Sequence, residues 1–325
     1  MTKRATSKAV FVTGIAGFAG SHLAEQLLEA GYQIYGALHP KESTAYLKGI
    51  KSNLELIRLD ITNAVRVAAA VQKIKPQFVC HLAALASVWR SFADMQKVFR
   101  VNFEGTLNLL EAAHQTGTVK KLLFVGSAEC YGTFSPKNKT LSEDQPLNPI
   151  SPYALSKAVA EQACMYYQRR HRLPVTISRS FAHTGSRQSV DFVVPSFARQ
   201  IAMIESSRRI PVLKVGNLSA KRDFSDVRDI VRGYRLMLEK GRPGRVYQLC
   251  SGRAVAIQTV LDMLLKMSAR KIEIEIDRTR LRKSDIPVQR GSNSRAVQEL
   301  GYASRYSLRE TLTECLEYFR DQVQT

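Results

Sequence analysis

Hydrophobic and polar positions alternate along the first half of the chain in a repeating strand and helix pattern. Short runs of consecutive apolar residues, typical of buried strands, occur at residues 9–13, 33–38, 54–59, 78–82, 121–125 and 174–179. Longer stretches with apolar residues at helical spacing lie at residues 21–30, 94–115 and 152–172. Continuously apolar strands separated by helices predict a parallel sheet that is covered by helices on both faces. The predicted fold class is therefore a doubly wound α/β fold.

The pattern becomes less regular after residue 180. Short strands are predicted at residues 211–215, 246–249 and 271–276, among helices and polar loops. A helix predicted at residues 225–239 is expected to return to the first domain. We therefore predict a first domain over residues 1–181, to which residues of about 218–240 return. A smaller α/β lobe is predicted mainly from residues 182–325, with an interleaved boundary.

The composition is that of an ordinary globular protein, since 45% of the 325 residues are hydrophobic and 23% are charged. The sequence has no run of about 18 apolar residues that would span a membrane, and its N-terminus has no apolar signal core. We expect a cytoplasmic protein. The five cysteines are far apart and form no CxxC pair, which favours reduced, buried thiols over disulfides or a zinc site. No metal is expected.

The net charge of +20, from 48 Lys and Arg against 28 Asp and Glu, is the one unusual feature of the composition. Such a charge is typical of proteins that bind nucleic acid, an acidic membrane surface or a small anionic substrate. The basic residues are spread along the chain, and their tightest cluster is residues 169–172. Because no basic tail or zinc-finger spacing accompanies them, nucleic-acid binding is the less favoured interpretation. A solvated basic surface explains the charge more simply.

Three glycines, Gly14, Gly17 and Gly20, follow the first predicted strand and open the first predicted helix. Their GxxGxxG spacing differs slightly from the GxGxxG fingerprint, but the strand, turn and helix context is the one that this fingerprint requires. Glycines permit a tight turn and let a pyrophosphate approach the free N–H groups of a helix N-terminus. The motif predicts a dinucleotide site in a Rossmann-type domain, with Phe18 as a further contact.

The second predicted strand ends without the acidic residue that usually binds the ribose 2′-hydroxyl of NAD. His39 and Lys41 stand there instead, and they suit the 2′-phosphate of NADP(H); a solvent-exposed loop is the alternative. His81 is expected to be a packed structural histidine rather than a ligand. Further coenzyme contacts are predicted at the ends of the next two strands, at Asp60, Ile61, Leu82, Ala83 and Ala84.

Tyr153 and Lys157 form a YxxxK motif near the start of the helix predicted at residues 152–172, where the spacing of four places both on one face. A phenol has an ordinary pKa near ~10, so it needs a neighbouring cation to favour its ionised form. Lys157 supplies that charge and is expected to lower the pKa of Tyr153. Ser127 ends the fifth predicted strand. Together these residues predict a Ser/Tyr/Lys site for proton transfer.

These motifs occur in an order that resembles the extended short-chain dehydrogenase/reductase family. The motifs are GxxGxxG, Asp60-Ile61, Leu82-Ala83-Ala84, Asn102 with Gly105-Thr106, Ser127, and Tyr153 with Lys157. The resemblance covers essentially the whole chain. It implies a nucleotide-sugar substrate, and a homodimer that forms through the helices around residues 94–115 and 152–172.

The second half is similar to a narrower group, the GDP-6-deoxy-D-mannose reductases and their sister GDP-mannose 4,6-dehydratases. Four stretches carry this similarity: residues 192–201, 214–224, 226–231 and 281–287. By resemblance, Arg222 and Arg282 would bind the substrate diphosphate, and Lys214 and Asp285 would lie near the nucleoside. Guanidinium groups suit phosphate oxygens. Ser87 and His183 are further candidate substrate contacts, and Glu129, present in both branches, is a fourth catalytic candidate.

Two departures from the family pattern affect the expected substrate. Ala182 stands where the family usually has Asn, and the usual Gly-Pro-Gly-Gln turn reads Gly185-Ser186-Arg187-Gln188. Either Arg187 replaces the missing substrate contact or the substrate differs. The activity implied is NADPH-dependent reduction of a nucleotide-linked 4-keto-6-deoxy sugar, GDP-4-keto-6-deoxy-D-mannose to GDP-D-rhamnose. The alternatives are an NADP-dependent 4,6-dehydratase or 4-epimerase and, more remotely, a non-catalytic dinucleotide- or nucleic-acid-binding protein.

Overall fold

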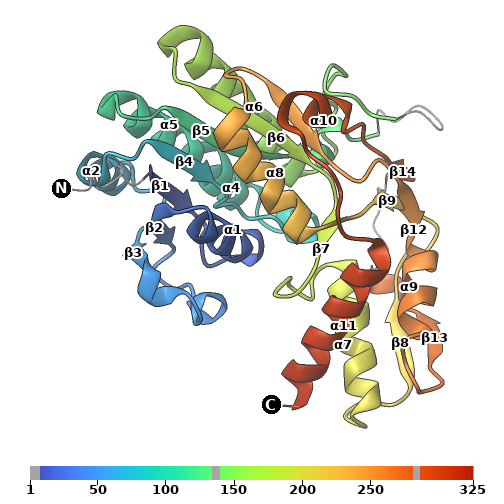
Figure 1. The fold of residues 1–325 in the computed structure, drawn as a ribbon. Helices are drawn as coiled ribbons and strands as arrows, with labels where there is room; N and C mark the ends of the chain where they lie inside the picture. The colour runs from blue at the N-terminus through green and yellow to red at the C-terminus, as the bar shows by residue number, and fades with distance from the viewer. Residues whose placement is uncertain (1–7, 134–139, 281–285, 325) are drawn as a thin grey trace.

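The computed structural model describes residues 8–133, 140–280 and 286–324. Figure 1 shows a large sheet flanked by helices, and a smaller lobe that includes the C-terminal helix. Among the described helices, none combines the length and the hydropathy that a bilayer crossing requires. All five cysteines are buried free thiols, as predicted.

The large sheet has seven strands in the order β11-β6-β5-β4-β1-β2-β3, and every neighbouring pair is parallel. The predicted doubly wound parallel sheet is therefore confirmed. Because the strand order reverses between β1 and β4, the crevice at the carboxyl ends of these strands is where a ligand is expected in such a fold. The strands are β1 (Lys8–Thr13), β2 (Tyr32–Leu38), β3 (Leu54–Arg58), β4 (Phe78–His81), β5 (Lys121–Ser127), β6 (Val175–Ser180) and β11 (Val246–Leu249).

Helices cover both faces of this sheet, and each face buries its own apolar cluster. On one face α1 (Phe18–Glu29) and α8 (Val227–Lys240) pack against each other and against apolar side chains of the strands. On the other face lie α2 (Ala64–Ile74), α5 (Gly105–Thr116) and α6 (Pro152–His171). The continuously apolar strands follow from this arrangement, because a strand buried on both faces has no polar side.

The helix predicted over residues 94–115 is interrupted in the structure. It consists of α4 (Met95–Phe99), a π-helical segment (Arg100–Glu104) and α5. Asn102, in the π-helical segment, accepts a hydrogen bond from the Leu85 N–H (2.8 Å) and donates to the Ser156 hydroxyl of α6 (3.0 Å). Such π segments occur often at functional sites, and this one joins α6 to the chain that follows β4.

The smaller lobe has its own apolar core between three helices and a two-stranded parallel sheet. The helices are α7 (Val193–Glu205), α9 (Ile257–Leu265) and α11 (Leu308–Gln324), and the strands are β8 (Val212–Val215) and β13 (Glu273–Ile276). The other strands form two small sheets: β7 (His183–Thr184) with β10 (Ser225–Asp226), and β9 (Lys221–Asp223) between β12 (Ala254–Ala256) and β14 (Val288–Gln289). The remaining short helices are α3 (Val88–Ser91), η1 (Ala45–Leu47), η2 (Lys51–Asn53), η4 (Ala128–Tyr131), η5 (Arg278–Arg280) and α10 (Ser294–Leu300).

One predicted strand lies in a different place from the one expected. Residues 246–249 were expected in the smaller lobe, but β11 is the seventh strand of the large sheet and pairs with β6. Helix α10 packs against it and against α8. The physical reason is that β6 is buried beneath α8, and β11 supplies the hydrogen-bonding partner that its free edge needs. Helix α8, within the segment expected to return to the first domain, packs against α1.

Candidate active site

The turn between β1 and α1 is shaped by its glycines. Gly14 has φ +71° and donates its N–H to the Ala37 carbonyl (3.0 Å). A Cβ on Gly20 would overlap the Gly14 carbonyl oxygen, so only glycine fits there. Gly17 caps α1 without a side-chain hydrogen bond, which leaves the first N–H groups of the helix open to a ligand. This arrangement fits the diphosphate of a dinucleotide.

The end of β4 packs directly against this glycine turn. A Cβ on Gly14 would lie 2.8 Å from the Ala83 nitrogen, which shows how closely residues 82–84 pass it. His81 is buried between two hydroxyls: its Nδ1 is 2.7 Å from Thr13 Oγ1 and its Nε2 is 2.9 Å from Thr106 Oγ1. Burial, with a smaller contribution from the charge of Lys157, lowers the pKa of His81 to about 3. His81 is therefore the neutral, structural histidine that was predicted.

The loop after β2 carries His39 and Lys41 and is held in place by Arg58, at the end of β3. The Arg58 guanidinium donates to the carbonyls of His39 (3.4 Å), Pro40 (2.6 Å) and Glu42 (3.0 Å). The Lys41 N–H donates to His39 Nδ1 (3.2 Å). His39, Lys41 and Arg58 are thus neighbours at the end of β2, the place predicted for a 2′-phosphate. Arg58 is not among the residues that the sequence predicts for the site, because an arginine at a strand end is usually a surface residue.

Asp60 and Ile61 lie beside this loop, at the end of β3. Asp60 Oδ2 is 3.9 Å from His39 Nε2, and Asp60 Oδ1 accepts hydrogen bonds from the N–H and the hydroxyl of Thr62. Burial alone would raise the pKa of Asp60, but the hydrogen bonds from Thr62 outweigh it and hold the pKa below its usual value. The Ile61 side chain packs against Gly105 of α5, where a Cβ would lie 2.7 Å from Ile61 Cδ1.

The predicted catalytic residues come from β5 and the first turns of α6. Helix α6 begins at Pro152, and the hydroxyl of its N-cap Ser151 accepts a hydrogen bond from the Ala154 N–H (3.1 Å). This cap places Tyr153 in the first turn, where its buried hydroxyl is hydrogen-bonded to Ser127 at the end of β5. Ser127 and Tyr153 are thus brought together across the carboxyl edge of the sheet.

The protonation of Tyr153 differs from the one expected from the sequence. Burial raises the pKa of Tyr153 well above its ordinary value, and the hydrogen bond with Ser127 opposes this only in part. The tyrosine therefore keeps its proton at neutral pH. Lys157 is buried one turn further along, with Nζ 4.5 Å from the centre of the Phe124 ring, and burial lowers its pKa to about 8. The expected lowering of the Tyr153 pKa by Lys157 is not found, because burial outweighs the one hydrogen bond, from Ser127, that lowers it.

Glu129 lies in the short helix η4, directly after β5. Its N–H donates to the Ser127 hydroxyl (3.2 Å). Its carboxylate is close enough to Tyr153 to raise the pKa of that phenol. Ser127, Tyr153 and Glu129 therefore come together at the end of β5, and Lys157 lies over Phe124 of the same strand.

The predicted substrate residues that the structure describes come from several separate elements. His183 stacks on Phe18 of α1, with ring centres 5.8 Å apart, and its Nδ1 is 2.8 Å from the Phe181 carbonyl oxygen. Ser87 caps α3 by accepting a hydrogen bond from the Arg90 N–H (3.3 Å). Arg222, on β9, donates to the Ile286 carbonyl (2.6 Å), and Lys214 Nζ, on β8, is 3.9 Å from Glu275 Oε1. Arg282 and Asp285 lie outside the described residues.

Comparison with known proteins gives the family. The family model described as GDP-mannose 4,6 dehydratase matches residues 11–315. The chain belongs to this family. GDP-6-deoxy-D-mannose reductase from Pseudomonas aeruginosa is 30% identical over 314 residues, which cover 97% of this chain and 98% of the relative.

Solved structures show the same likeness in three dimensions. The structure of RMD from Pseudomonas aeruginosa complexed with NADPH has a TM-score of 0.83 at 28% identity and covers 97% of this chain and 100% of its own. UDP-glucose 4-epimerase from Thermotoga maritima, solved with UDP-glucose, has a TM-score of 0.87 at 27% identity, with 97% and 99% covered. The extended short-chain dehydrogenase/reductase fold expected from the motifs is therefore confirmed.

In this member of the GDP-mannose 4,6 dehydratase family, Arg187 stands in the turn where the usual motif has its second glycine. Its backbone is left-handed, with φ +70°, a conformation that favours the glycine usual at this place. Its guanidinium forms an ion pair with Glu25 of α1 (2.7 Å) and donates to the Ser21 hydroxyl (3.3 Å). Arg187 thus links the turn after β7 to α1, and contact with the substrate stays a prediction.

Proposed function

We propose that the protein is an NADPH-dependent reductase of a nucleotide-linked 4-keto-6-deoxy sugar, with GDP-4-keto-6-deoxy-D-mannose as substrate and GDP-D-rhamnose as product. The observation that carries the proposal is the buried Tyr153 hydroxyl, which is hydrogen-bonded to Ser127 and keeps its proton at neutral pH. Reduction of a ketone needs such an acid, because the carbonyl oxygen must take up a proton. Full-length similarity to a GDP-6-deoxy-D-mannose reductase supports the choice of substrate.

The residues at the β1–α1 turn fit the coenzyme. Gly14, Gly17 and Gly20 would hold the diphosphate, and the loop with His39 and Lys41 would hold the 2′-phosphate. The relative solved with NADPH supports this choice of coenzyme. NADPH, when bound, supplies the hydride that reduces C4 of the sugar.

The chain's own residues would manage the proton and the charge. Tyr153 would donate its phenolic proton to O4 of the sugar, and the Ser127 hydroxyl would donate a hydrogen bond to the same oxygen. The ammonium group of Lys157 would offset the negative charge left on the Tyr153 oxygen. Arg222 would bind the diphosphate of the substrate, since guanidinium forks match phosphate oxygens.

This function is tested by measuring how many NADPH molecules are oxidised for each sugar molecule reduced. Purified protein given GDP-4-keto-6-deoxymannose should oxidise one NADPH for each sugar reduced, and GDP-mannose alone should stay unchanged. A 4,6-dehydratase, which regenerates its nicotinamide in every cycle, would instead form the 4-keto sugar from GDP-mannose without added NADPH. That outcome would replace the reductase proposal with the dehydratase alternative, which the similarity to several dehydratases keeps open.

We further infer a homodimer that forms through the helices around residues 94–115 and 152–172. Met95, at the start of the first, and Tyr166, on the second, are large apolar side chains that are 46% and 54% exposed. Burying them against a second copy would remove that apolar surface from water. Sedimentation equilibrium at micromolar protein should give twice the chain mass of 36.4 kDa; a single-chain mass would contradict the dimer.

A further inference from the structure

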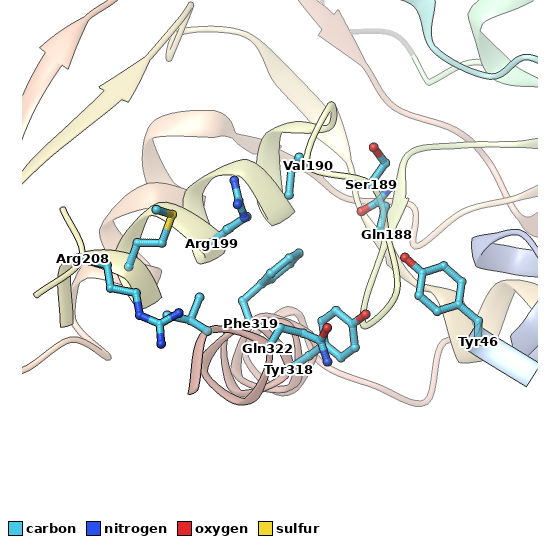
Figure 2. Close-up of a pocket in the computed structure, with 11 residues that line it drawn as sticks. Tyr46, Gln188, Ser189, Val190, Arg199, Arg208, Tyr318, Phe319 and Gln322 are labelled. Atoms are coloured by element: carbon cyan, nitrogen blue, oxygen red, sulfur yellow. The ribbon is translucent and has the colours of Figure 1, made fainter. Parts of the chain in front are cut away.

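A cavity of about 510 Å³ lies between the 45–47 segment of the large domain and the α7 and α11 helices of the smaller lobe. Its lining includes Tyr46, Gln188, Arg199, Arg208 and Phe319, and none of the four catalytic candidates. Figure 2 shows Arg199 and Arg208 on one side of Phe319, and Gln188 and Tyr46 on the other. A cavity of this volume is of the size that holds a small organic ligand.

The charge of the lining favours an anion. Among the described residues that line it, Arg199 and Arg208 are the charged ones, and none is a carboxylate. Within the residues that the structure describes, neither guanidinium forms an ion pair or a side-chain hydrogen bond. Nearby carboxylates are instead neutralised by other arginines: Glu25 by Arg187 (2.7 Å), Asp191 by Arg90 (2.9 Å) and Glu205 by Arg320 (2.7 Å). Two guanidinium groups without a protein anion suit a phosphate.

The rest of the lining favours an aromatic ring attached to that phosphate. Tyr318 and Phe319 are adjacent on α11, and the Tyr318 hydroxyl is hydrogen-bonded to Tyr46 from the other domain. Phe319 packs in the apolar core of the smaller lobe, and the half-buried ring of Tyr318 is the one that offers a stacking surface. The Gln188 amide is buried and is already hydrogen-bonded to His183 and Thr184, so the exposed amide of Gln322 is the one at the cavity that can pair with the edge of a base.

We propose that this cavity is a second ligand site, separate from the Ser127 and Tyr153 site, and that it binds a nucleoside monophosphate. The phosphate lies on Arg199 and Arg208, and the base lies against Tyr318. The proposal goes beyond the reductase function and does not depend on it. The site adjoins the predicted substrate turn, because Gln188 also donates to the His183 carbonyl (2.9 Å) and accepts from the Thr184 hydroxyl (2.7 Å).

Calorimetric titration of the full-length protein with guanosine 5′-monophosphate, in saturating NADPH, tests the proposal. The wild type should show two classes of binding site, one in the nucleotide-sugar cleft and one in the cavity. Arg199→Ala and Arg208→Ala should each weaken the cavity class by roughly tenfold or more, as expected for loss of a charged hydrogen bond. Arg222→Ala should weaken the other class and leave the cavity class unchanged. Guanosine without phosphate should bind the cavity weakly in every variant.

The control is Arg309→Ala, which removes the same charge from an exposed position on α11 outside the cavity lining. It should keep both classes of site. All three cavity and control variants should keep the wild-type rate of NADPH oxidation, which shows that they are folded. A wild-type isotherm with one class of site that Arg222→Ala abolishes, or Arg199→Ala and Arg208→Ala isotherms equal to that of the wild type, would overturn the proposal and leave the cavity a solvent-filled groove.

Discussion

At the scale of single residues, the proposed chemistry depends most on the Tyr153 hydroxyl. Tyr153→Phe removes the proton donor but keeps the ring, so we expect turnover to fall by ~10² or more, the range for loss of general acid catalysis. NADPH affinity, measured by coenzyme fluorescence, should stay nearly unchanged. Tyr166→Phe, on an exposed part of the same helix, is the matched control and should turn over normally. Near-normal turnover of Tyr153→Phe would remove Tyr153 from the mechanism.

The pH dependence of turnover should report the buried ammonium of Lys157, whose pKa burial lowers to about 8. Below that value the ammonium is charged and can offset the charge on the Tyr153 oxygen, so kcat should fall as the pH rises through about 8. Lys157→Arg keeps the positive charge at higher pH, because a guanidinium stays protonated, and should lose this limb of the profile even if its rate is lower. A wild-type kcat that stays flat through pH 8 would exclude Lys157 as the titrating group.

The lowered pKa of Lys157 makes the stability of the fold change with pH in the direction opposite to that of kcat. The folded pKa of Lys157, about 8, lies below the unfolded value of ~10.4, so the unfolded chain binds more protons between these two values. The free energy of unfolding should therefore rise with pH across this window while activity falls. The charged lysine costs stability below pH 8, which is expected where burial serves a site rather than the fold.

At the scale of elements, the loop between β2 and η1 should set the coenzyme preference. Arg58→Ala removes the hydrogen bonds to three loop carbonyls, so His39 and Lys41 lose their fixed positions. We expect the ratio of kcat/KM for NADPH to that for NADH to fall by roughly tenfold, the effect of one charged hydrogen bond. Lys41→Ala, which removes charge without freeing the loop, is the comparison.

Two outcomes would contradict this interpretation of the loop. Equal losses for NADPH and NADH in Arg58→Ala would mean that Arg58 supports the fold of the domain and not the 2′-phosphate contact. A wild-type kcat/KM that is higher with NADH would mean that the missing acid at the end of β2 does not signal NADPH.

The hydrophobic pattern predicts most strands of the large sheet well, but it does not predict that β11 joins the edge of this sheet. The six strands expected from apolar runs all lie in one parallel sheet, because burial on both faces leaves a strong local signal. The strand β11 also has an apolar run, yet four residues carry no information about which edge they will join. The YxxxK spacing places Tyr153 and Lys157 on α6 correctly, but the burial that changes their pKa values is a property of the packed site, not of the spacing.

At the scale of the whole molecule, side chains of the turn after β7 join the two parts of the protein. His22 Nε2, on α1, is 3.1 Å from the Ser186 carbonyl oxygen, and the Ser186 hydroxyl donates to Glu314 of α11 (2.8 Å). Arg187 pairs with Glu25 on the other side of the same turn. The sequence shows that this turn departs from the family pattern, but the direction in which Arg187 points depends on α1, more than 150 residues away along the chain.

The roles of Arg187 in joining the lobes and in binding substrate can be separated by three variants. Arg187→Ala keeps a left-handed residue and loses the ion pair, whereas Arg187→Gly loses the ion pair and relieves the backbone strain. Arg187→Ala should therefore unfold with a free energy lower than that of Arg187→Gly by about 1 kcal/mol.

Glu25→Gln breaks the same ion pair while leaving the Arg187 side chain in place. In steady-state assays, a KM for the keto sugar that rises in both Arg187 variants but not in Glu25→Gln means that Arg187 binds the substrate, as the turn motif predicts. Equal KM values in all three and in the wild type would restrict Arg187 to its structural link with α1, and this turn would then hold no substitute for the asparagine amide that the family usually has where Ala182 stands.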